Sequence, residues 1–95
     1  MKMGRVVGSV VATRKDPSLV GVKLLVVENL SPEMKSEAGY VVAVDVVGAG
    51  ANEVVLYASG SSARQTPVTR DRPVDAVIMA IVDSFEAHGK NVHLA

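Results

Sequence analysis

Residues 40–64 read YVVAVDVVGAGANEVVLYASGSSAR, and this stretch decides the fold. Two runs in it, residues 40–47 and 53–59, predict strands, because β-branched side chains favour a pleated backbone over a helix. The glycine-rich segment 48–52 separates the runs, and the small-residue corner 60–64 ends the second one. Glycine permits positive φ angles and Asn52 is the next most tolerant residue there, so we expect a hairpin that joins the two strands.

The first run is apolar on both of its faces. One face carries Tyr40, Val42, Val44 and Val46, and the other carries Val41, Ala43, Asp45 and Val47. A strand with one face in water alternates apolar with polar residues, which this run does not do. We therefore expect one face to line the core of the domain and the other to contact another subunit.

Length and composition exclude several classes of protein. The chain has 95 residues, enough for a single domain spanning residues 1–95. Lys plus Arg and Asp plus Glu both number 10, so a net charge of zero gives no general attraction to nucleic acid or to an anionic membrane. The absence of cysteine excludes a disulfide scaffold, thiolate zinc sites and a cysteine nucleophile. We expect neither a signal peptide nor a membrane helix, which needs roughly 20 apolar residues.

The rest of the sequence predicts three more strands and a tail. The strands are expected at residues 5–13, 23–30 and 74–85, with Val and Ile favouring strand over helix in the last of them. Polar segments with proline or glycine predict loops at residues 14–21, 31–39 and 66–73. Ser61 is expected to be the N-cap of a helical turn at 61–65, and a short final strand is expected at 91–94. Five short strands in so small a domain favour an all-β fold, a five-stranded OB-like barrel with one helical turn.

Two motifs resemble ligand sites but lack the required geometry. The segment 48–53 has the first two glycines of a dinucleotide fingerprint but lacks the third, and a strand follows where phosphate binding needs a helix N-terminus. His88 and His93 are the only histidines, and their spacing of five with a glycine between them does not suit a metal pair. We therefore expect no cofactor and no metal ion.

The sequence gives equally little support for catalysis and for nucleic-acid binding. Asp45, Asp75 and Asp83 lie in or beside apolar strands, which favours partnered interface or strand-end carboxylates over acid–base catalysis. Ser61 and Ser62 lack a nucleophile-elbow motif and a histidine in the rigid part of the chain. Barrels of this kind bind single-stranded nucleic acid by stacking its bases on aromatic residues in a positively charged groove. Aromatic residues make up only 3% of this chain, and its net charge is zero.

Six segments of the sequence form one recognisable set: residues 6–13, 24–27, 42–50, 53–56, 60–64 and 74–83. The most specific pattern among them joins Ala-x-Asp-x-x-Gly-Ala-Gly to Gly-Ser-Ser-Ala-Arg. In order and spacing they resemble the EutN/CcmL family of bacterial microcompartment vertex proteins over nearly the whole chain, from Met3 to Phe85. One departure is Asn52, where the family often has glycine, and we expect the loop to survive because Asn tolerates a left-handed backbone.

The resemblance implies a structural protein and not an enzyme. It implies a barrel at about residues 3–85 with a tail at 86–95, homopentamers that occupy the five-fold vertices of a polyhedral shell in the bacterial cytoplasm, and hexameric shell proteins as partners. A ring of identical subunits would also cover the second apolar face. The alternative hypothesis is a small OB-like module that binds a ligand or nucleic acid.

Two segments are the candidates for the pore or the subunit interface. We expect the 48–53 loop and the 60–64 corner to lie at or near the ring axis or the subunit seam, because small residues let several backbones converge. Arg64 is expected to pair with a carboxylate across the seam. The candidate residues are Asp45, Gly48, Ala49, Gly50, Asn52, Glu53, Gly60, Ser61, Ser62 and Arg64.

Overall fold

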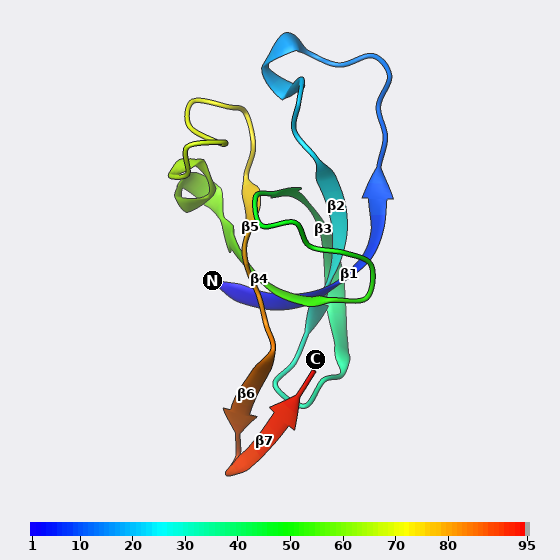
Figure 1. Ribbon diagram of the computed structural model, residues 1–95, viewed down its shortest axis with the longest axis vertical. Helices are drawn as coiled ribbons and strands as arrows, with labels where there is room; N and C mark the ends of the chain where they lie inside the picture. Colours follow the sequence, from blue (N-terminus) through cyan, green and yellow to red (C-terminus); the bar gives the residue numbers. More distant parts are fainter. Residues whose placement is uncertain (95) are drawn as a thin grey trace.

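A computed structural model describes residues 1–94, and its centre is a closed barrel of five strands (Figure 1). This confirms the predicted all-β fold with a five-stranded barrel. Five segments form the barrel: β1 (Lys2–Val10), β2 (Leu24–Leu30), β3 (Ser36–Asp45), β4 (Val54–Ser59) and β5 (Ala76–Ile81). Two short 3-10 turns, η1 (Pro17–Leu19) and η2 (Gly60–Arg64), lie outside it, and the sequence predicted only the second.

The predicted hairpin between the two central runs is wrong. The strand order around the barrel is β1-β2-β3-β5-β4, so β5 lies between β3 and β4. β3 pairs with β5 in parallel, with Val44 opposite Val77, and β4 pairs antiparallel with β1 and β5. Two hydrogen bonds hold the connecting loop against β1. Asn52 N donates to Val6 O (2.8 Å), and Val6 N donates to Glu53 O (2.9 Å). The glycine-rich loop is therefore a crossover and not a tight turn.

Several predicted strand boundaries are also wrong. β1 lies three residues earlier than expected, and β3 begins at Ser36 because polar side chains at its start bond to β2. Ser36 Oγ and Tyr40 Oη donate to the Glu28 carboxylate at 2.8 and 3.0 Å, so a polar segment that resembled a loop is paired as a strand. The Ser61 N-cap is wrong as well, because Ser59 holds that position and its side chain makes no capping hydrogen bond.

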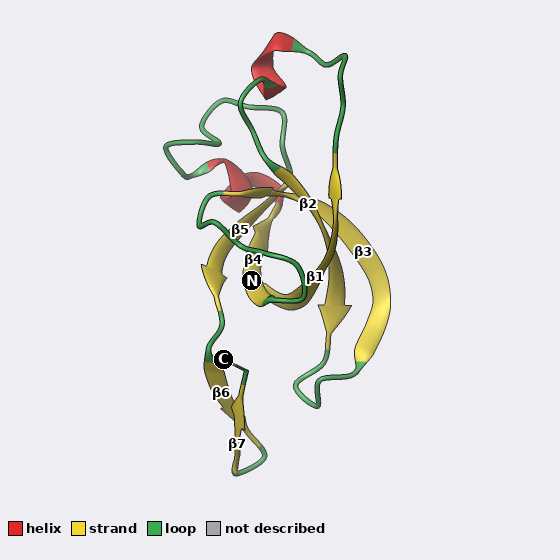
Figure 2. Cartoon of the chain, turned by 45° about the vertical axis from the view of Figure 1, so that its right-hand side comes forward, coloured by secondary structure: helices red, strands yellow, loops and turns green. Residues whose placement is uncertain are grey.

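The predicted last strand at residues 74–85 divides into two elements. β5 ends at Ile81, and Val82 N donates to Val54 O at 2.8 Å as the final contact with β4. The chain then forms a separate hairpin of β6 (Ser84–Ala87) and β7 (Lys90–His93), which extends away from the barrel (Figure 2). The expected final strand is present one residue earlier than predicted, but it pairs with β6, which the sequence did not predict.

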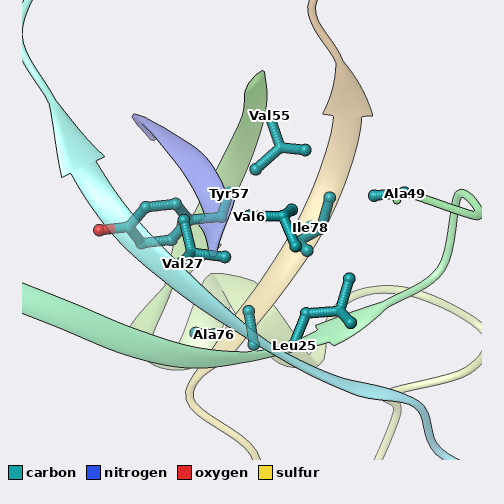
Figure 3. Close-up of a cluster of buried hydrophobic side chains, with 9 residues drawn as sticks. Val6, Leu25, Val27, Ala49, Val55, Tyr57, Ala76 and Ile78 are labelled. Atoms are coloured by element: carbon teal, nitrogen blue, oxygen red, sulfur yellow. The ribbon is translucent and has the colours of Figure 1, made fainter. Parts of the chain in front are cut away.

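The barrel interior holds an aliphatic core with one buried tyrosine. All five strands contribute residues to this inner core, which Figure 3 shows in close-up. Tyr57 is almost fully buried and its hydroxyl donates to Asn29 Oδ1, while burial raises the pKa of the Tyr57 phenol. The inner core consists of Val6, Leu25, Val27, Ala43, Ala49, Val55, Tyr57, Ala76 and Ile78.

A second apolar cluster lies on the outside of the barrel. Val44, Ala58 and Val77 point outward, and Ala63 of η2 packs on them. Part of the second apolar face is thus covered by the chain itself, where the sequence predicted a partner subunit. The rest of that face, including Val42 and Tyr40, is exposed. None of the helical turns in residues 1–94 has the length and apolar character that crossing a bilayer requires.

We predict that Gly4→Ala destabilises the fold, because β1 crosses β2 closely at this residue. A Cβ atom on Gly4 would lie 2.4 Å from Val27 Cγ1 and 2.7 Å from the backbone oxygen of Glu28. The strands must move apart, which costs about 1–3 kcal/mol of unfolding free energy. Urea denaturation at a fixed protein concentration measures the loss.

Gly8→Ala is the matched control in the same strand. Its Cβ atom would meet Val26 at an ordinary contact distance of 3.8 Å, so its unfolding midpoint stays close to that of the unmodified protein. Equal midpoints for the two variants would contradict the close approach at Gly4.

Candidate functional site

The 48–53 loop has the backbone that its residue types predicted. Gly48 has a φ of 77° and Asn52 has a φ of 68°, both in the left-handed region. This confirms that Asn52 can take the position where glycine is common in the resembled family. Positive φ at both ends bends the chain back toward β1.

Asp45 fixes the start of this loop. Its side chain is 1% exposed, and Oδ1 accepts hydrogen bonds from the backbone N–H groups of Val47 and Gly48 at 3.1 Å each. Lys23 Nζ lies 3.7 Å from Asp45 Oδ2 and donates to Ala49 O at 3.3 Å. Asp45 therefore has a local structural role at the end of β3.

Glu53 and Ala49 hold the rest of the loop against the barrel. Glu53 Oε1 accepts from Gly50 N at 2.6 Å, and Arg5 Nη1 donates to the backbone oxygen of Asn52 at 2.8 Å. The side chain of Ala49 is buried within the inner core of its own subunit. The Ala49 side chain closes one end of the barrel, while Gly48 and Asn52 are exposed on the outside of the loop.

The 60–64 corner forms η2, and its polar side chains point outward. Ser61, Ser62 and Arg64 are exposed, whereas Ala63 is fully buried. Gly60 has a φ of 65° and donates its N–H to Asp75 O at 2.9 Å, which fixes the corner to the start of β5. Arg64 Nη1 donates to Val74 O at 3.2 Å, and within residues 1–94 no other acceptor bonds to its guanidinium, which has five N–H donors.

Within residues 1–94, the structure keeps the two candidate segments separate. Hydrogen bonds tie the 48–53 loop to β1 and Lys23, and tie η2 to the residues just before β5. The described chain contains no group of three His, Asp or Glu residues arranged to hold a metal ion. His88 is paired with Glu33 at 3.0 Å, which connects the β6–β7 hairpin to the loop after β2.

Other important residues carried no signal in the sequence. Arg72 Nη1 donates to Ser18 O at 2.8 Å and to Val20 O at 3.3 Å, which joins two loops far apart in the chain. Thr66 and Thr69 are buried and bond to each other through Oγ1 atoms 2.6 Å apart. Glu28 accepts the Tyr40 hydroxyl and raises the pKa of that phenol, first through the hydrogen bond and then through its charge. Arg72 and Glu28 bond to residues that are distant in the sequence, and no local pattern predicts such partners.

The known proteins that this chain resembles in sequence and in structure belong to one family. Residues 1–83 match the family described as ethanolamine utilisation protein EutN/carboxysome. The carboxysome shell vertex protein CcmL of Synechococcus elongatus is 44% identical over 98% of this chain and 94% of its own. The structure of CcmL from Nostoc superposes with a TM-score of 0.92 at 44% identity, covering 98% of each chain. The structure of GrpN, a pentameric microcompartment shell protein from Rhodospirillum rubrum, gives a TM-score of 0.84 at 44% identity over 92% of this chain and 99% of that one.

We predict that Asp45→Ala destabilises the protein by about 1–2 kcal/mol, because two backbone N–H groups lose their acceptor. Asp45→Asn is the matched control, since its amide oxygen can still accept both hydrogen bonds and only the ion pair with the exposed Lys23 is lost. Thermal unfolding monitored by circular dichroism measures both variants. Equal losses for Ala and Asn would show that charge, and not loop geometry, is what Asp45 provides.

Proposed function

Because this chain belongs to the family described as ethanolamine utilisation protein EutN/carboxysome, we propose that five copies of it form a ring that caps a vertex of a bacterial microcompartment shell. The observation that carries the proposal is the match of the whole fold to a pentameric shell protein. The chain is a structural component of such a shell and resides with it in the bacterial cytoplasm.

A five-fold ring meets a geometric need of closed shells. Flat layers of hexagons cannot close into a polyhedron without five-fold positions, so a vertex protein must fit between hexameric neighbours. We propose hexameric shell proteins as the partners around the rim of the ring. The rotation between identical subunits must close after five copies, which a single repeated head-to-tail contact achieves.

The proposed role requires no catalysis, cofactor or nucleic acid. Asp45 and Glu53 of the candidate segments use their carboxylates in local hydrogen bonds. Ser61 and Ser62 are exposed on the surface of η2. These features suit an assembly unit.

We further propose that the 48–53 loop and η2 lie at the ring axis or along the subunit seam. Gly48, Asn52, Gly60, Ser61 and Ser62 are exposed and small enough to let neighbouring backbones approach. Arg64 is held on one side by Val74 O and pairs with a carboxylate of the next subunit through its other N–H groups.

Native mass spectrometry tests the ring directly. We expect a species of five times the 9.9 kDa chain mass, and no binding of a single-stranded oligonucleotide in a polarisation assay at physiological salt. A monomer that retains the oligonucleotide would instead support a small binding module. A monomer that binds nothing would contradict both assignments.

We predict that Arg64→Ala weakens the ring because a charged hydrogen bond across the seam is lost. The concentration at which half of the subunits are free rises by about tenfold, which corresponds to the loss of one such contact. Arg70→Ala is the control, since Arg70 is also exposed but lies in the loop beyond η2. Identical dilution curves for both variants would place Arg64 away from the seam.

A further inference from the structure

The outer surface of the barrel carries more apolar side chains than η2 covers. η2 protects Val44 and Val77, but farther along β3 the outward side chain of Val42 is 48% exposed. The strand register shows which residues share this outward face, because paired residues of neighbouring strands lie on the same side of a sheet.

The first uncovered surface, here called face A, extends across β1, β2 and β3. Val42 is paired with Val26, which is paired with Gly8, and Leu24 is paired with Val10 in the next outward row. A hollow of about 210 Å³ lies at its edge, with Leu24, Val42 and Val74 among its lining residues. Face A consists of Val7, Val10, Leu24, Val26 and Val42.

The second surface, face B, extends across β1, β4 and β5. Leu56 points outward because its neighbours Val55 and Tyr57 are in the inner core, and it is paired with Met3 on one side and Ala80 on the other. Face B consists of Met3, Leu56, Met79 and Ala80. Face B shares only β1 with face A, so the two surfaces lie on different sides of the closed barrel.

Both faces are completed by a β-bulge. The register shifts between Val6 and Gly8 in β1, and again where Leu56 and Tyr57 of β4 face Ala80 and Ile78 of β5. The extra residues are Val7 and Met79, which are 45% and 40% exposed. Bulges re-aim side chains, and here each one adds a large apolar side chain to an outer face.

We propose that the seam of the ring is formed by face A of one subunit packing on face B of the next. This inference rests on the proposed pentamer and assigns its contact surfaces. A cyclic ring needs a contact between two different surfaces of the same chain, and faces A and B are two unlike apolar surfaces. A row of polar residues, Arg5, Glu28 and Tyr40, lies beside face A on the same three strands and forms its rim.

The candidate segments border this seam. Val74 lines the hollow of face A and also accepts the Arg64 hydrogen bond, which places η2 at the edge of the contact. Arg5, in the polar row, holds the 48–53 loop through Asn52 O. The apolar faces supply the buried area, and the polar candidate residues lie along its rim.

One charge on each face tests the assignment. Val42→Glu damages face A, Met79→Glu damages face B, and Val11→Glu is the control because Val11 is 92% exposed outside both faces. Burying a carboxylate at an apolar contact is strongly unfavourable. We expect native mass spectrometry to show monomers for each face variant and pentamers for the control, with circular dichroism spectra unchanged in all three.

Mixing the two face variants distinguishes the proposed pairing from any other. The intact face A of Met79→Glu can pack on the intact face B of Val42→Glu, but the other two faces cannot pair. The mixture should therefore give a heterodimer of about twice the 9.9 kDa chain mass. Homodimers of either variant alone, or no dimer in the mixture, would overturn the pairing.

The outcomes separate this inference from the proposed function. A pentameric unmodified protein whose face variants remain pentameric would overturn the seam and leave the vertex role intact. A monomeric unmodified protein would overturn the vertex role itself. Val42→Thr and Met79→Gln provide milder versions should a Glu variant fail to fold, and they should raise the half-dissociation concentration by about tenfold.

Discussion

A five-stranded barrel has one interior, whereas each of its strands has two faces, and this constraint governs the rest of the structure. The inner core takes only aliphatic residues and Tyr57. The outward apolar residues must be covered by something else, and η2 covers those around Val44 and Val77. What η2 leaves uncovered must be buried by a neighbour or remain in water, so the small size of the barrel favours association.

The long crossover between β3 and β4 also follows from this constraint. Because β5 separates the two strands, the chain must cross one end of the barrel, and Ala49 fills the inner core there. Asp45 and Glu53 accept hydrogen bonds from backbone N–H groups of the turning chain, while Lys23 forms an ion pair with Asp45 and donates to Ala49 O. The polar residues of the loop thus hold its shape, and the exposed Gly48 remains available for contacts outside the subunit.

The strands were predictable from sequence because β-branched density is a local property. The all-β fold, the barrel and the left-handed backbone at Asn52 followed from residue types alone. The hairpin prediction failed because a glycine-rich segment serves equally for a tight turn or a crossover, and only pairing with β1 decides between them. The start of β3 was missed because its polar residues are paired through Glu28, a partner that no local pattern reveals.

The position of β5 has a consequence for the order of folding. β4, β1, β2 and β3 can pair in one open sheet without β5, and the barrel closes only when β5 is inserted between β3 and β4. Pairings between segments that are distant in the sequence are slow to form. Closure by β5 should therefore be a late step, so an open sheet precedes each closed barrel.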